Sequence, residues 1–165
     1  MPPPDPAEKR LLLAAFLIGT TVLLIAGSVT PDERGYGTHT QLGIAPCGYL
    51  LRTGDPCPTC GMTTSFAHLA RFRFASAFRT QPFGALLATG LWIATVGSLF
   101  ALVAGRSARP WLARLPRPRW WIAAAVLLFF ASWAWTKARH DADERIEVPA
   151  REARRQESSV SRIRE

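Results

Sequence analysis

Charged residues are missing from three long stretches of this 165-residue chain. The stretches are 11–29, 83–104 and 120–136, and each is close to the roughly 20 apolar residues that a helix needs to cross a bilayer. A chain of this length has room for about one ordinary domain, and a soluble domain of that size has no use for three such helices. The composition therefore excludes a soluble single-domain enzyme. It predicts an all-α membrane protein with three transmembrane helices in contact with the lipid bilayer.

Acidic residues are scarce as well, with 12 Asp and Glu against 20 Lys and Arg and a net charge of +8. The loop 106–119 holds five arginines and no acid, a pattern typical of short loops on the cytoplasmic side of a membrane. Together with Lys9 and Arg10, it predicts a multi-pass protein of the bacterial inner (cytoplasmic) membrane. Because the basic residues follow this membrane pattern, we do not expect nucleic acid as a partner.

Familiar catalytic patterns are absent. The sequence has no glycine-rich phosphate loop, no evident serine–histidine–acid set and no pair of carboxylates near a membrane face. Asp55 is the only acid between Glu33 and Asp141, and its place before Pro56 predicts a turn cap rather than an acid or base. These absences favour a protein that is not an enzyme.

The pattern along the chain predicts eight segments. In order, they are a cytoplasmic N-terminal segment (1–10), a transmembrane helix (11–29), an exposed loop with the cysteine motif (30–62), an interfacial helix (63–81), a transmembrane helix (82–105), a basic cytoplasmic loop (106–119), a transmembrane helix (120–136) and a disordered charged tail (137–165). The segment 63–81 contains Arg71, Arg73 and Arg79, which we expect to meet lipid headgroups or water. The tail carries 8 basic and 7 acidic residues and too few apolar ones to fold alone.

Two alternatives to this topology remain open. Residues 120–136 are short for a span, and if they lie on the membrane surface only two spans remain. The first apolar run is followed by the small residues Ala26 and Ser28, so cleavage as a signal peptide is the second alternative, although the run is longer than usual for one.

Cysteine is rare, and all three cysteines fall within residues 44–62, a segment that also holds three prolines and three glycines. Cys57 and Cys60 form a Cys-x-x-Cys motif, with Cys47 ten residues upstream and His68 eight residues downstream. Two cysteines at this spacing can bring both sulfurs onto one small target. A second such pair would have been a strong sign of zinc, and the chain has none.

Three interpretations of this segment compete. Cys47, Cys57, Cys60 and His68 supply a three-cysteine, one-histidine set for tetrahedral zinc. A disulfide between Cys60 and either Cys57 or Cys47 would instead brace the loop, which is predicted on the outer face where disulfides persist. The third interpretation is a thiol–disulfide oxidoreductase with Cys57 as attacking thiol and Cys60, favoured as a thiolate by a helix start, as resolving thiol.

Our leading hypothesis is a membrane protein whose cysteine knuckle, metal-bound or disulfide-braced, serves folding or assembly with a membrane partner or a second copy. The oxidoreductase is the alternative.

The stretch 46–84 resembles the family of small bacterial membrane proteins grouped as domain of unknown function 2752. The resemblance rests on the motif positions Cys47, Thr53, Gly54, Cys57, Pro58, Cys60, Gly61, Thr63 and Pro82. Many members carry Arg where this chain has Thr64, Gly near Phe72 and Asn in place of Gln81. The resemblance implies a membrane fold and an important cysteine segment, and it supplies no reaction.

Overall fold

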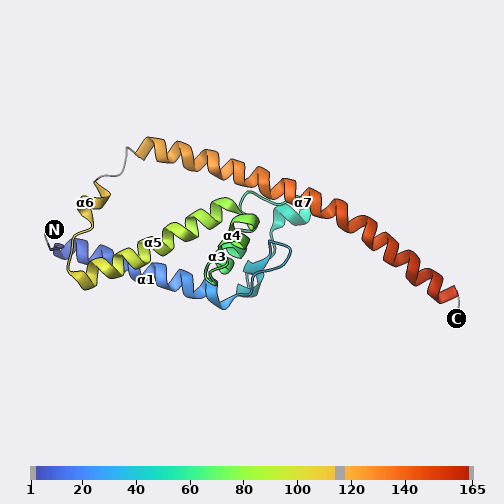
Figure 1. Cartoon of the computed structure of the whole chain (residues 1–165), viewed down its shortest axis with the longest axis horizontal. Coiled ribbons are helices and arrows are strands. Elements are labelled where there is room, and N and C mark those ends of the chain that lie inside the picture. The colour runs from blue at the N-terminus through green and yellow to red at the C-terminus, as the bar shows by residue number, and fades with distance from the viewer. Residues whose placement is uncertain (1–2, 114–117, 164–165) are drawn as a thin grey trace.

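Three long helices dominate the computed structural model, which describes residues 3–113 and 118–163 (Figure 1). They are α1 (Pro6–Ser28), α5 (Pro82–Ala104) and α7 (Pro118–Ile163), and every regular element in the described residues is helical. By length and hydropathy, the segments that can cross a membrane are Pro6–Ser28, Pro82–Ala104 and Trp120–Ala142. The predicted all-α fold with three membrane-length helices is confirmed.

Helices α1 and α5 pack side by side and antiparallel (Figure 1). Each begins with a proline in its first turn and an N-cap side chain, Asp5 for α1 and Gln81 for α5. They cross where Gly19 faces Thr95, because a Cβ at Gly19 would lie only 2.0 Å from the Thr95 Oγ1. Small side chains let helices approach in this way where lipid offers no hydrophobic drive for association. The large apolar side chains of both helices face outward, as expected for lipid contact.

At one end of this helix pair, a buried carboxylate joins the start of α1 to the residues that follow α5. Glu8 near the start of α1 is buried, and it accepts hydrogen bonds of 2.9 Å from the Ser107 hydroxyl and 2.8 Å from the Ala108 amide after α5. Arg109, in the short helix α6 (Arg109–Leu112), pairs with Asp5 at 2.7 Å. The N-terminal segment and the basic loop therefore meet at the same end of the spans. Within that predicted loop, residues 114–117 lie outside the described residues.

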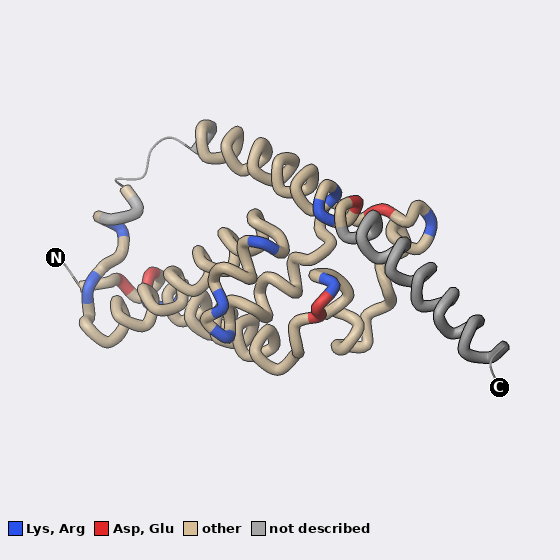
Figure 2. The backbone as a smooth tube through the Cα atoms, turned by 45° about the vertical axis from the view of Figure 1, so that its right-hand side comes forward, with Lys and Arg blue, Asp and Glu red and all other residues tan. Residues whose placement is uncertain are grey.

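The other end of the pair carries a cap of four short helices. They are the 3-10 helix η1 (Thr38–Leu42) and the α-helices α2 (Gly48–Thr53), α3 (Met62–Leu69) and α4 (Phe74–Thr80). The segment 30–62, expected to be an exposed loop, thus contains two short helices, and Thr38 within it is fully buried. Figure 2 shows the backbone with Lys, Arg, Asp and Glu coloured; these residues lie toward the ends of the spans.

The single interfacial helix expected at 63–81 is two helices, and this expectation is corrected. The helix is interrupted between α3 and α4, where Phe72 takes a left-handed conformation with φ of 58°. The break lets Leu69 and Ala77 pack together against Ala85 and Ala88 of α5, which one straight helix could not achieve.

Arg71 lies in this break and turns toward α1. Its guanidinium donates hydrogen bonds to the Gly27 carbonyl at 3.0 Å and the Ala26 carbonyl at 3.5 Å. It therefore binds the last carbonyls of α1, which have no partner within their own helix. The sequence predicts contact with lipid headgroups or water for this arginine, and the structure corrects that prediction. The carbonyls at the end of α1 attract the guanidinium because they lie at the negative end of the helix dipole.

Helix α7 diverges from the pair at its beginning and meets the rest of the chain near the cap (Figure 1). It continues to Ile163, so the disordered tail expected from residue 137 is corrected as well. Residues 137–163 contain no glycine and are rich in Ala, Arg and Glu. Most of these residues favour the extension of a helix that the apolar segment has already started, and Pro149 is the exception.

Candidate thiol site

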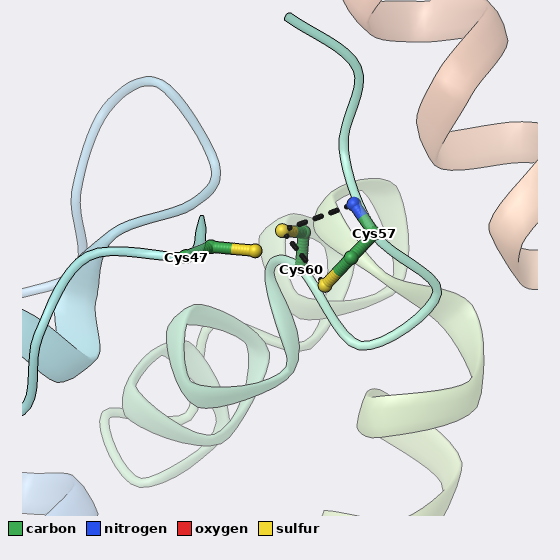
Figure 3. Close-up of side chains that lie close together, drawn as sticks. All are labelled: Cys47, Cys57 and Cys60. Atoms are coloured by element: carbon green, nitrogen blue, oxygen red, sulfur yellow. Dashed lines mark hydrogen bonds between the residues drawn. The ribbon is translucent and has the colours of Figure 1, made fainter. Parts of the chain in front are cut away.

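The three cysteines come from two chain segments that meet at the cap (Figure 3). Cys47 is the N-cap of α2, and Gly54 with φ of 76° ends that helix. Cys57 to Cys60 form a turn in which the Cys60 amide donates to the Cys57 carbonyl at 3.0 Å. Gly61 follows with φ of 86° and lets α3 begin directly after the turn.

The three sulfur atoms all lie within 4.8 Å of one another. The Cys57 and Cys60 Sγ atoms are 3.1 Å apart, and the Cys57 amide points at the Cys60 Sγ at 3.3 Å. No disulfide joins these cysteines in the structure; Cys60 is buried and the other two are half-buried. The predicted convergence of the cysteine residues is therefore present, with Cys47 joining the Cys-x-x-Cys pair.

His68 is not part of this cluster, so the structure does not bring the proposed fourth zinc ligand to the sulfurs. The physical reason is the direction of α3, which begins beside Cys60 and carries His68 to its far end. Burial, together with the positive charges of Arg73 and Arg71, holds the pKa of His68 below its ordinary value. Its Nδ1 atom is buried and has no hydrogen-bond partner among the described residues.

The two thiols of the Cys-x-x-Cys pair differ in acidity. Burial raises the pKa of Cys60 strongly, and the neighbouring Cys57 sulfur raises it further. Partial burial acts in the same direction on Cys57, but hydrogen bonds from the Thr59 hydroxyl and the Cys60 thiol outweigh it and hold the pKa of Cys57 below its ordinary value. Cys57 is thus the better thiolate, whereas the sequence had suggested Cys60. Burial at the start of α3 outweighs any help from the helix dipole.

Several motif residues hold the turn against the helices below it. A Cβ at Gly61 would lie 2.7 Å from the Gly35 carbonyl oxygen, so the two backbones touch there. Gln81 is fully buried; its side chain accepts from the Gly84 amide at the start of α5, just after Pro82, and donates to the Pro58 carbonyl at 3.4 Å. These contacts tie the cysteine turn directly to the beginning of a membrane-length helix.

In the helices that follow the cysteine turn, the Ser65 hydroxyl of α3 donates to the Ala77 carbonyl of α4 at 2.8 Å and joins the two helices. Both Ser65 and Ala77 are fully buried. The packing beneath the cysteine turn is therefore held by hydrogen bonds as well as by apolar contact.

Sequence reasoning missed the contribution of α7 to this site. Trp133 lies near the end of the apolar run 120–136, and its indole N–H donates to the Pro56 carbonyl at 3.0 Å. Lys137 forms a 2.9 Å ion pair with Asp55, and the His140 Nε2 lies 2.9 Å from the Gly54 carbonyl oxygen. The signal in the sequence was the spacing of these three donors, four and then three residues apart at the end of an apolar run.

Comparison with known proteins identifies one family in this region. Residues 47–95 match the model of the family described as a protein of unknown function, DUF2752. The match begins at Cys47 and covers the cysteine turn, α3, α4 and the first half of α5, so the resemblance inferred from the motif is confirmed. No curated protein and no solved structure matches the chain.

Proposed function

We propose that this chain is a non-enzymatic, multi-pass protein of a bacterial inner membrane that binds one thiophilic metal ion, Zn²⁺ or Cu⁺, at Cys47, Cys57 and Cys60. The observation that carries the proposal is the meeting of three sulfur atoms, from two separate segments, within 4.8 Å of one another. A disulfide needs only two cysteines. The arrival of the third at the same point favours a shared ion.

The distances suit such an ion. Zinc holds each thiolate sulfur at about 2.3 Å, so two sulfurs at the tetrahedral angle lie about 3.8 Å apart. The 3.1 Å separation of the Cys57 and Cys60 sulfurs therefore opens slightly on binding, and the third sulfur already lies within 4.8 Å of both. Thiolates are the ligands that select Cu⁺ and Zn²⁺ over harder ions. Metal binding also overcomes the raised pKa of Cys60, because the ion replaces the thiol proton, which is released to water.

The site offers three protein ligands among the described residues. Structural zinc is almost always bound by four, so an ion held here keeps one position for water or for a ligand from another protein. Cys47 and Cys57 are only half-buried, which leaves that position within reach. We infer that the ion stabilises the cap by joining its two segments and provides a contact for a membrane-protein partner or a second copy.

The orientation follows from the two ends of the helix pair. Glu8 and Ser107 bring the N-terminal segment to the basic loop, and arginine-rich short loops stay in the cytoplasm. The thiol site lies at the other end of α1 and α5, which supports our assignment of the site to the outer side of the membrane.

The deciding experiment counts thiols and metal on the same sample. Protein is purified in detergent without reductant or chelator, thiols are counted after denaturation, and metals are measured by elemental analysis. We expect three free thiols and about one Zn²⁺ or Cu⁺ per chain, and loss of the metal in C47S. Three thiols with no metal, and no uptake of either ion on reconstitution, would contradict the proposal.

A disulfide exchange function is the second candidate, favoured by the 3.1 Å separation of the Cys57 and Cys60 sulfurs and the lowered pKa of Cys57. In this case the Cys57 thiolate attacks a substrate disulfide and releases one substrate thiolate. Cys60 then gives up its proton and attacks Cys57, which forms the Cys57–Cys60 disulfide and frees the second substrate thiol. One free thiol and no metal in the same experiment would select a disulfide. Resistance to mild reductant would then indicate a structural brace, and easy reduction with mixed-disulfide formation an exchange function.

A further inference from the structure

Helix α7 presents two different faces to the cap. On one face, Trp133, Lys137 and His140 contact residues 54–56, the segment that leads directly into Cys57. On the other face, Trp135 and Arg139 both donate to the carbonyl of Arg79 near the end of α4. The first face reaches the thiol site and the second does not.

The contacts of the first face fix three consecutive residues. His140 donates to the Gly54 carbonyl, Lys137 pairs with the Asp55 carboxylate at 2.9 Å and Trp133 donates to the Pro56 carbonyl at 3.0 Å. Pro56 is buried, and its ring restricts the backbone on both sides. The path of the chain into Cys57 is therefore set from outside the cap, by a helix that follows in sequence about 80 residues later.

We infer that α7 positions Cys57 in the metal site, so that metal binding and the seating of α7 on residues 54–56 stabilise each other. This inference rests on the proposed metal-binding function. Thermodynamic linkage requires the coupling to act in both directions: α7 raises the affinity for the ion, and the ion strengthens the docking of α7. Because α7 continues past the cap to Ile163, the state of the thiol site is passed to a helix that extends beyond the membrane-length segment (Figure 1).

The chain itself offers matched controls for the test. W133F removes the indole N–H that donates to the Pro56 carbonyl, next to Cys57. W135F removes the indole N–H that donates to the Arg79 carbonyl instead. K137M and R139M form a second pair in the same manner. All four substitutions lie within residues 133–139, near the middle of α7, and each replaces a donor by an apolar side chain.

The first measurement is metal affinity in detergent, by titration of Zn²⁺ and of Cu⁺ against a coloured chelator. For the ion that the wild-type protein binds more tightly, we expect the W133F/K137M variant to lose about threefold to thirtyfold in affinity, as one or two net hydrogen bonds predict. The W135F/R139M variant should bind within about twofold of wild type. Equal affinities for both double variants would overturn the inference.

The second measurement tests the opposite direction, and the metal response itself is read in wild-type protein. The six tryptophans are labelled with 5-fluorotryptophan, and W133F and W135F assign their two ¹⁹F signals. Metal addition should shift the Trp133 signal and leave the Trp135 signal in place. Wild-type protein that binds metal without moving the Trp133 signal refutes the coupling alone. Wild-type protein that binds neither ion refutes the metal site on which the coupling rests.

Discussion

Phe72 gives the sharpest test of the cap, because its backbone conformation is destabilising for a residue other than glycine, whereas its side chain makes a stabilising contact. It is a non-glycine residue in the left-handed region, with φ of 58°, at the break between α3 and α4. The residue is 64% exposed, and its ring meets that of Trp92 edge to face, with the ring centroids 5.7 Å apart. The two substitutions F72A and F72G remove the same ring, and they differ only in how easily the backbone adopts this conformation.

The expected difference can be worked from these observations. A left-handed conformation costs an L-residue about 1–2 kcal/mol, and glycine avoids this cost. Glycine also loses about 0.5–1 kcal/mol more conformational entropy on folding than alanine does. The balance makes F72G more stable than F72A by roughly 0.5–1 kcal/mol. Both variants lose the aromatic contact, worth about 0.5–1.5 kcal/mol, so F72G should lie near wild type and F72A below it.

The assay is unfolding in mixed micelles with increasing SDS, followed by helical circular dichroism. At an ordinary helix position the order of the two variants would be reversed, with glycine about 1 kcal/mol less stable than alanine. An F72A variant as stable as F72G, or more stable, would therefore refute the left-handed turn at this residue.

Three further predictions concern close approaches and access. G19A should destabilise the α1–α5 crossing by about 1–3 kcal/mol in the same SDS assay, while G27A, which has open space on the same helix, should be neutral or slightly stabilising. G61A should be destabilised more than G54A, because both strain a left-handed glycine but only the new Cβ at Gly61 meets a backbone oxygen at 2.7 Å; equal losses would argue against that contact. In metal-free protein, mass spectrometry after brief alkylation should find Cys57 modified well before the buried Cys60, and a bound ion should protect both.

The fold was largely predictable because a helix that crosses a bilayer needs a long apolar run, and such a run can be read directly from the sequence. Three charge-free runs near the length of a span needed no tertiary information to be recognised as membrane-length helices. The break at Phe72 was different. The segment 63–81 has no proline or glycine inside it, so local propensity favours one helix. Packing of Leu69 and Ala77 on the same part of α5 decides otherwise, and such a contact cannot be read from a single segment.

The thiol site was predictable in part. The Cys-x-x-Cys spacing and the rarity of cysteine pointed to Cys57 and Cys60, and Cys47 followed as the only other thiol. His68 was included by its distance along the chain, which says little about distance in space once a helix intervenes. The docking of α7 had no local signal strong enough to be noticed, because a tryptophan at the end of a span is usually explained by the membrane interface.

Position 64 shows how the cap accommodates a polar side chain without water. Thr64 is fully buried, and its hydroxyl lies 2.8 Å from that of Thr38. A buried charged side chain at this position would need a carboxylate or several carbonyls to offset the loss of water, whereas a hydroxyl needs far less compensation. This hydrogen bond joins α3 to η1 directly after the cysteine turn, and Gln81 joins the same turn to α5. Polar contacts on both sides of the turn therefore hold the segment that carries Cys57 and Cys60.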